Sequence, residues 1–507
     1  MKQYSKYTKY VVMSLFATFF LSSCMDYEDI NTPEYLPGKL STGAYFGQML
    51  NSVYPAQENA YQIDQNFIGD VYGRYMSISN KWDNHFATFN AVEDWVGSPF
   101  RTLSSFYPAW IEVRNKTNGE GVIFAWAQIL RVAKMQRLTD IYGPIPYSQI
   151  KGNSITVAYD SQEEVYNHFF EDLDKAIDEL TVYALAFPND RPMADFDKVY
   201  GSDFKQWVKF ANSLKLRLAM RIVYANPTLA KQKAEEAVSH PIGVFATNSD
   251  NASLIYKPNG IYQVATNWGD TRTCADLVSY MNGYNDPRRA AYFGTNSTGN
   301  YVGLRSGVNV TSKASVQDYS IPKFAEADET LWMNAAEVAF LKAEGALRGW
   351  NMGAGTVESL YNDAIKLSFE EHATTGVDAY LANSADKPAA CNDPLHASPA
   401  ISTITIKWDN SATEEVKLER LITQKWIAMW PLGTEAWCDY RRTGYPRFFP
   451  VEVNRSTEAS LTTVAARIPF EPKEKINNAA NYAGAVSLLG GADVYGTKLW
   501  WDKKPNK

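Results

Sequence analysis

The amino-acid sequence predicts a mostly α-helical protein whose helices are separated by long, aromatic-rich loops. Apolar side chains recur at helical intervals in several segments, and two of these segments are neighbours joined by a short connection. Only short pieces show the alternation that is typical of strands. A helical hairpin is the unit of helical-repeat proteins, although no clean 34-residue period is visible here. We therefore expect helix pairs with degenerate repeats.

Helix starts are marked by capping residues as well as by apolar spacing. Ser161 with Glu164 has the pattern of a capping box, and Asn334 precedes Glu337 in the same way. The fourth expected helix and the fifth form the hairpin. The expected helices cover, in order, about 123–133, 161–180, 207–218, 334–349, 357–369 and 418–429.

Two long stretches, about 79–118 and 241–330, are expected to be irregular. They are rich in Asn, Gly, Thr and aromatic residues and poor in helical spacing. A long loop in a folded domain is usually functional or disordered, and the aromatic content argues against disorder. The alternating run at 402–406 predicts a minor strand.

The first 23 residues have the features of a cleavable export signal. A lysine-containing start is followed by an apolar run from Val11 to Leu21, which is too short for a bilayer that needs about 20 apolar residues. The run ends in Leu-Ser-Ser before Cys24, which resembles the bacterial lipoprotein cleavage box. We therefore expect Cys24 to be acylated. Several acyl chains would anchor the protein firmly, since each buried methylene contributes about 0.8 kcal/mol of membrane affinity. An ordinary signal peptide with a chance cysteine is the alternative.

A short polar tether is expected to follow the anchor, at 24–38. Asp26, Glu28 and Asp29 keep it solvated and also resemble the acidic signal that sends lipoproteins of Bacteroides-type bacteria to the cell exterior. Residues 39–507 are expected to form a single domain. No later segment approaches 18 uninterrupted apolar residues, so we expect no further membrane span.

Composition excludes some function classes. A net charge of −7 argues against nucleic-acid binding, which needs a basic face. If Cys24 is acylated, at most one disulfide can form, and whether any pair bonds is left open. The remaining cysteines are Cys274, Cys391 and Cys438.

No motif for catalysis or for a cofactor is visible. The five histidines contain no HExxH pair, and no G-x-S-x-G elbow occurs. No carboxylate pair stands out as a glycosidase site. A structural calcium site around Asp195, Asp197 and Asp203 is conceivable, but an ordinary polar loop is the favoured interpretation because no EF-hand loop is present. We therefore expect a binding protein without a metal or cofactor.

Five segments follow one another behind the lipoprotein signal. They are Leu-Thr-Asp-Ile-Tyr-Gly-Pro-Ile-Pro-Tyr at 138–147, the helix at 207–221, Asn-Asp-Pro-Arg at 285–288, the helix start at 333–344, and 424–442 with its Asp-Tyr-Arg-Arg. In this order they resemble the SusD/RagB family of outer-membrane nutrient-binding lipoproteins. The resemblance covers essentially the whole mature chain.

The resemblance implies a fold of tetratricopeptide-like helix pairs with loops on one side. It also implies a non-enzymatic lid on a SusC-type TonB-dependent transporter, which takes in oligosaccharides or, in some members, peptides. The shared segments are mainly structural, and we expect Glu337 and Arg441 to make buried charge-assisted bonds rather than to touch ligand. An oligopeptide binder, a surface glycosidase and a purely structural surface protein remain alternatives.

The ligand is expected at aromatic loops, because sugars present flat C–H faces and polar rims. The resemblance implies one loop in the N-terminal third, matched by 75–95, and others in the middle of the chain. For each single aromatic, a core role remains the main alternative, and no binding residue transfers by motif. The primary candidates are Trp82, Asn84, His85, Trp95, Trp268, Tyr301 and Arg305, with Tyr262, Asn267 and Tyr319 as further mid-chain candidates.

Overall fold

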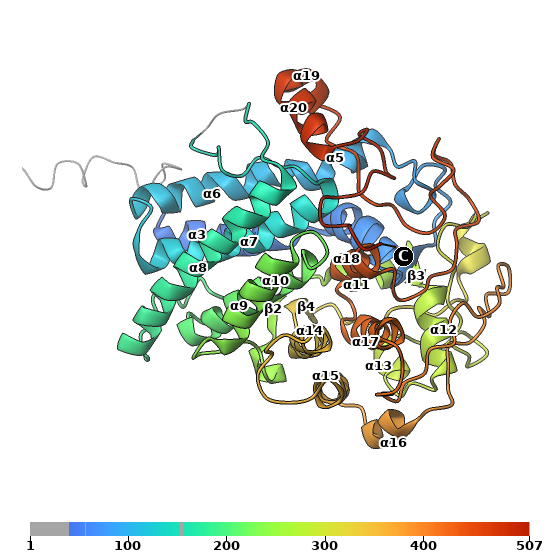
Figure 1. Ribbon diagram of the computed structural model, residues 1–507. Coiled ribbons are helices and arrows are strands. Elements are labelled where there is room, and N and C mark those ends of the chain that lie inside the picture. The colour runs from blue at the N-terminus through green and yellow to red at the C-terminus, as the bar shows by residue number, and fades with distance from the viewer. Residues whose placement is uncertain (1–39, 56, 153–155, 506–507) are drawn as a thin grey trace, which may run out of the picture.

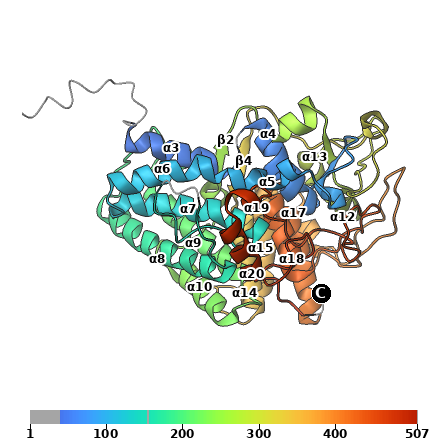
Figure 2. The same cartoon turned by 90° about the horizontal axis from the view of Figure 1, so that it is seen from above.

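The computed structural model describes residues 40–55, 57–152 and 156–505. Long helices gather in one half of the molecule, and shorter elements with long loops make the other half (Figure 1). The view from above shows the same division, with α12 and α13 on the loop-rich side (Figure 2). The expected export signal, Cys24 and the tether lie outside the described residues.

The helix-rich half is built from neighbouring helices that pack on one another in chain order. α7 packs on α8, α8 on α9 and α9 on α10, while α3 packs on both α6 and α7. This arrangement confirms the expected helix pairs. The helices are α3 (Thr42–Val53), α6 (Leu103–Lys116), α7 (Gly121–Tyr142), α8 (Gln162–Ala186), α9 (Phe204–Arg221) and α10 (Pro227–Ser239).

A second group of helices follows later in the chain. α14 (Ala335–Leu347) pairs with α15 (Val357–Glu371), and α17 (Glu414–Ala428) packs on both. The remaining helical elements are α4 (Glu58–Ala60), η2 (Tyr61–Asp70), η3 (Phe86–Thr88), α5 (Glu93–Arg101), η4 (Asn248–Asp250), α11 (Gly260–Tyr262), η5 (Gln263–Asn267), α12 (Ala275–Gly283), α13 (Arg289–Tyr292), η6 (Lys313–Val316), α16 (Val377–Ala382), α18 (Gly433–Thr443), α19 (Glu474–Asn477) and α20 (Ala479–Leu489).

The predicted helix starts are confirmed at the level of single hydrogen bonds. Ser161 and Glu164 form the reciprocal capping box of α8. Asn334 caps α14 by accepting a hydrogen bond from the backbone N–H of Glu337. All six expected helices are present, as α7, α8, α9, α14, α15 and α17.

The expectation that 79–118 is irregular is wrong for its second half, which forms α5 and α6. The buried side chains of α6 include Phe106, Ala109, Trp110 and Val113, which have helical spacing. Pro108 lies inside this helix, and proline normally argues against a helix interior. The stretch 241–330 likewise contains α12.

The prediction of a strand at 402–406 is also wrong. Side chains alternate as predicted, with Ile404 and Ile406 buried and Thr403 exposed, but the segment joins no sheet. Tyrosine hydroxyls satisfy its backbone instead, because Tyr284 donates to the carbonyl of Ile404 (3.0 Å) and Tyr361 to that of Ile406 (2.6 Å). The segment is extended chain whose hydrogen bonds go to side chains.

Two small antiparallel sheets join segments that are far apart in sequence. β1 (Met76–Ile78) pairs with β3 (Thr271–Thr273), with Ser77 opposite Arg272. β2 (Ala252–Ile255) pairs with β4 (Glu329–Met333), with a register shift next to Ala252. The first sheet brings the N-terminal loop candidates beside the mid-chain ones.

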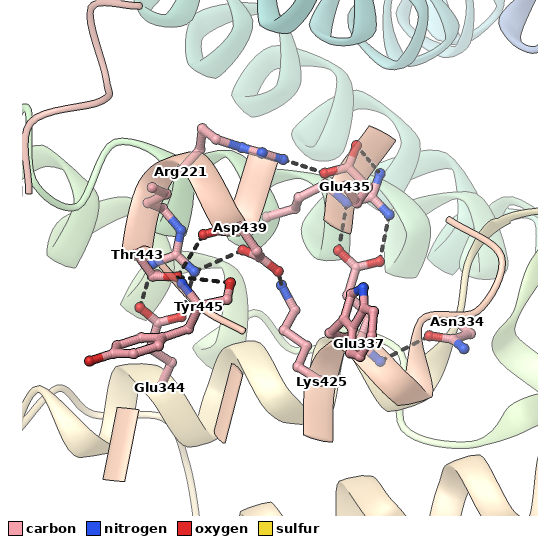
Figure 3. A network of polar contacts seen from close by, with 12 residues as sticks. Arg221, Asn334, Glu337, Glu344, Lys425, Glu435, Asp439, Thr443 and Tyr445 are labelled. Atoms are coloured by element: carbon pink, nitrogen blue, oxygen red, sulfur yellow. Dashed lines mark hydrogen bonds and ion pairs between the residues drawn. The ribbon is translucent and has the colours of Figure 1, made fainter. Parts of the chain in front are cut away.

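A buried network of charged side chains ties the helices together (Figure 3). Arg217 on α9 donates to both carboxylate oxygens of Glu337 on α14 (2.8 and 2.6 Å). Arg221, one turn further along α9, pairs with Glu435 on α18. Burial alone would raise the pKa of Glu435, but the two guanidinium groups lower it to about 2. Glu337 therefore makes the buried charge-assisted bonds that were expected.

The network continues from α17 and α18 to α14. Lys425 contacts Asp439 at 2.6 Å, and Figure 3 shows these two side chains pointing towards one another. Arg442 bridges Asp439 (2.9 Å) and Glu344 (2.5 and 2.8 Å). Arg441 also contacts protein, donating to the carbonyl of Asp140 at 2.7 Å.

The three cysteines in the described part of the chain, Cys274, Cys391 and Cys438, are buried free thiols. Among the described residues, no helix is both long and apolar enough to cross a membrane.

Candidate ligand-binding surface

Two π-helical segments, η2 and η5, support the loops that carry the predicted aromatic residues. η2 precedes β1 and the Trp82 loop, and η5 is followed directly by Trp268. The π-helix is rare and is frequently found at functional sites. The β1–β3 pairing continues into a bond from the backbone N–H of Ser79 to the carbonyl of Asp270 (3.0 Å). The two loops therefore leave the same end of one sheet.

Trp82 rests on a small aromatic cluster. Its ring meets Phe67 of η2 edge-on, at 5.1 Å between centroids, and Trp95 of α5 edge-on at 5.6 Å. Trp95 in turn lies 5.0 Å from Phe67. Both tryptophans are half-buried. Edge-to-face contacts fix the ring orientation, so the part of Trp82 that faces solvent is held in place.

Asp270 fastens the two loops together. Its carboxylate accepts hydrogen bonds from Gln62 of η2 (3.0 Å), Asn80 (2.9 Å) and the ammonium of Lys313 (2.5 Å). The same ammonium donates to the carbonyl of Trp268 at 2.9 Å. Asp270 is 8 % exposed. The Asp270 carboxylate thus links its own segment, which contains the half-buried Trp268, to the segments of Gln62, Asn80 and Lys313.

Asn84 and His85 are neighbours with different surroundings. Asn84 is exposed, and its side-chain oxygen accepts a hydrogen bond from Asn90 at 3.0 Å. His85 is buried, and burial, reinforced by Arg455, lowers its pKa to about 4. His85 is therefore neutral at pH 7, and of the pair only Asn84 offers a polar group to solvent.

Arg305 and Tyr301 lie on a segment that borders the same sheet. Leu304 donates to the carbonyl of Thr273 at the end of β3 (2.9 Å). The guanidinium of Arg305 is buried and pairs with Glu452 at 2.8 Å. Tyr301 is half-buried, with Phe293 edge-on at 5.5 Å. The structure therefore brings these two residues to the same sheet but gives Arg305 an internal partner.

The further candidates differ in exposure. Tyr262 is half-buried, and Asn267 is exposed with its amide donating to Gln263 at 2.7 Å. Tyr319 is buried, and its hydroxyl donates to Asp393 at 2.6 Å. Of these three, Tyr262 and Asn267 have surface available for a ligand.

Sequence reasoning missed Asp270, Lys313 and Gln62, which shape this surface. Only Asp270 had a local signal, because it lies two positions after Trp268, which is itself a candidate. Gln62 and Lys313 contact Asp270 across the fold, and nothing in their own sequence surroundings marks them.

The carboxylates considered for calcium have protein partners. Asp197 accepts from the backbone N–H of Ser202 (2.7 Å) and from the indole of Trp207 (2.8 Å). Asp203 caps α9, and Asp195 is exposed. In the described ranges, no group of three or more His, Cys, Asp or Glu side chains is placed to hold a metal ion.

The loop surface therefore combines held aromatic rings with amide groups. Trp82 and Trp268 provide half-buried rings, and Asn84 and Asn267 provide exposed amides. A ring beside hydrogen-bonding groups suits a ligand that has both an apolar face and a polar rim.

Comparison with known families gives a match over nearly the whole chain. The family model of SusD-like proteins, described as Susd and RagB outer membrane lipoprotein, matches residues 25–502. A search of curated proteins found no match.

Solved structures of high similarity come from several bacteria. A SusD homolog from Bacteroides uniformis is 43 % identical, with a TM-score of 0.88, covering 92 % of this chain and 100 % of its own. A chitin-binding SusD homolog from Flavobacterium johnsoniae is 40 % identical, with the same TM-score and coverage. A SusD-like protein from Bacteroides thetaiotaomicron is 39 % identical, with a TM-score of 0.88, covering 92 % of this chain and 99 % of its own.

Proposed function

Because this chain belongs to the SusD/RagB family of outer-membrane lipoproteins, we propose that it captures oligosaccharides outside the cell and delivers them to a partner transporter. The partner is a TonB-dependent barrel of the SusC type, and Cys24 carries the lipid anchor that keeps the protein beside it. The protein is a binding protein and not an enzyme, as are SusD-like proteins in general.

The observation that carries the proposal is the pair of half-buried tryptophans on adjoining loops. Trp82 is oriented by Phe67 and Trp95, and the Trp268 loop is fastened through Asp270. The C–H face of a sugar stacks on an aromatic ring. Because these rings are already held in position, binding carries no entropic cost for ordering the loop. Asn84 lies two positions from Trp82 and supplies an amide for hydroxyl groups.

Chitin oligosaccharides are the first ligands to test. The Flavobacterium johnsoniae relative is a chitin-binding protein and is 40 % identical over 92 % of this chain. N-acetylated sugars combine apolar faces with amide groups, which suits the tryptophan and asparagine side chains of the loop surface.

The test replaces both Trp82 and Trp268 with Ala and measures chitohexaose binding by calorimetry. Loss of two aromatic anchors should weaken binding about tenfold or more. Trp350→Ala is the matched control, because Trp350 is also half-buried but lies in the connection between α14 and α15. Unchanged affinity in a double variant that is folded by circular dichroism would rule out this surface. Saturable binding of oligopeptides in place of glycans would favour the peptide-binding alternative.

A further inference from the structure

A second concave site lies between the β2–β4 sheet and the C-terminal end of α15. It is a cavity of about 570 Å³ whose walls come from η4, β2, β4, α13, α15 and the turn at Trp430. None of the seven primary loop candidates lines it. The cavity is therefore separate from the proposed glycan surface, and its chemistry can be considered independently of it.

Glu371 lines this cavity at the C-terminal end of α15. Its two carboxylate oxygens accept hydrogen bonds from the neutral amides of Asn251 (3.1 Å) and Asn334 (2.8 Å). Burial raises the pKa of Glu371 to about 7, and the Asn334 bond opposes this only in part. Within the described residues, Glu371 takes part in no ion pair. A carboxylate in this position is stabilised by any cation that reaches it.

The rest of the charge around the cavity is also acidic. Asp328 and Glu329 line it, and Lys323 is its single basic lining residue. The ammonium of Lys323 donates to the carbonyl of Ala290 at 3.0 Å. The three carboxylates therefore outnumber the one ammonium, which is held at the backbone of α13.

Two buried polar atoms in the cavity wall have no hydrogen-bond partner in the described chain. They are the Nε2 atom of His372 and the side-chain oxygen of Asn248. Burial also lowers the pKa of His372 to about 4, so its ring is neutral at pH 7. A polar ligand in the cavity would satisfy both atoms.

The cavity also has an aromatic wall. Trp430 and Phe324 line the cavity, with 6.2 Å between their ring centroids. Tyr292 lies behind this wall and stacks on Trp430, at 5.5 Å and 12° between ring planes. Aromatic faces attract cations, and they attract an ammonium more strongly where water is partly excluded. Acidic groups, unpartnered polar atoms and an aromatic wall thus meet in one place.

We propose that this cavity binds the primary ammonium group of a small polar molecule, with Glu371 as the anion that holds it. The hydroxyl or amide groups of the same molecule satisfy His372 and Asn248. An amino sugar and the amino end of an amino acid or peptide share this chemistry.

The test is calorimetric titration of the full-length protein with glucosamine and with alaninamide, and with glucose as the neutral counterpart of glucosamine. Both amines are expected to bind saturably, and glucose at least tenfold more weakly. Glu371→Gln keeps the side-chain volume and removes the charge, so it should weaken amine binding about tenfold or more. If only one of the two amines binds, the source of the ammonium is identified.

A second variant does not depend on the Asn251 and Asn334 bonds. Ala291 lines the cavity on the short helix α13 and is partly exposed, so Ala291→Trp fills the space from the surface. It should abolish amine binding, while the Trp82→Ala/Trp268→Ala variant should retain it. Absence of amine binding at millimolar concentration, equal binding of glucose, or full affinity in folded Glu371→Gln would each overturn the proposal. None of these outcomes bears on the loop surface.

Discussion

Single buried charges in this protein are explained by partners that come from distant parts of the chain. Glu337 could be predicted to make a buried charge-assisted bond, because it lies in a helix start that resembles a structural family segment. Its partner Arg217 lies 120 residues earlier, and no local pattern connects the two. The same holds for Gln62 and Asp270, which are 208 residues apart. The kind of bond that a buried residue makes can therefore be predicted from the sequence, whereas the partner depends on the fold.

Glu344 offers a test of the buried network. Burial alone would raise its pKa, but Arg442 and Arg348 outweigh burial and lower the pKa from 4.5 to about 2. Replacing Glu344 with Gln removes the carboxylate that Arg348 and Arg442 share and leaves Arg442 with Asp439 alone, so the free energy of unfolding at pH 7 should fall by about 3–5 kcal/mol. Urea denaturation measures this change.

The effect of Glu344→Gln should depend on pH with a defined sign. A carboxyl whose folded pKa is depressed contributes stability above its unfolded pKa, and the contribution disappears as pH falls through the folded value. The difference between wild type and variant should therefore shrink between pH 4.5 and about 2. Glu370→Gln, on the exposed face of α15, is the matched control and should change stability little. A difference that stays constant with pH would contradict the assignment.

At the scale of elements, helices with caps and regular apolar spacing were predictable and others were not. The capping box of α8 and the cap of α14 were identified correctly. α6 was missed because the whole stretch 79–118 was taken as poor in helical spacing, although the buried side chains of α6 have that spacing. The extended segment at 402–406 was predicted as a strand because its side chains alternate. Alternation reports burial on one side, whereas a strand also needs a backbone partner, which here is replaced by tyrosine hydroxyls.

The candidate site depends on an element contact that no local pattern reveals, the pairing of β1 with β3, in which Ser77 lies opposite Arg272. The aromatic loops could be picked out by composition, but their proximity could not. Asp270 fastens this contact, so Asp270→Ala should loosen both loops while the helices remain folded. Hydrogen exchange should become faster at 79–85 and 263–270, and chitohexaose affinity should fall several-fold because the rings are no longer pre-positioned.

Lys323→Ala is the control for Asp270→Ala, because it also removes a charged side chain that makes a hydrogen bond, but does so at the other site. Unchanged exchange in both loops of Asp270→Ala would show that the sheet alone holds them.

At the scale of the whole molecule, the aromatic loops of the proposed glycan surface lie in the loop-rich half (Figure 1). The helices provide much of the large core. The proposed tether connects this body to the outer membrane. A binder released from the cell would lose its ligand to diffusion, whereas a tethered one stays at high effective concentration beside its transporter.

Cys24→Ala tests the role of the anchor. The variant should bind chitohexaose with unchanged affinity, because Cys24 lies outside residues 25–502, which the family model matches, but uptake of the glycan by cells should be impaired. The measurement is growth on the glycan together with fractionation of the protein between membrane and medium. Normal growth with the protein fully released into the medium would exclude the anchor from the mechanism.

A crystal structure of the protein with chitohexaose tests the proposed glycan surface most directly. We expect a sugar ring stacked on Trp82 or Trp268, with hydroxyl or acetamido groups hydrogen-bonded to side chains of the 79–95 and 263–270 loops. A glycan bound elsewhere on the protein, with both tryptophan faces free, would contradict it.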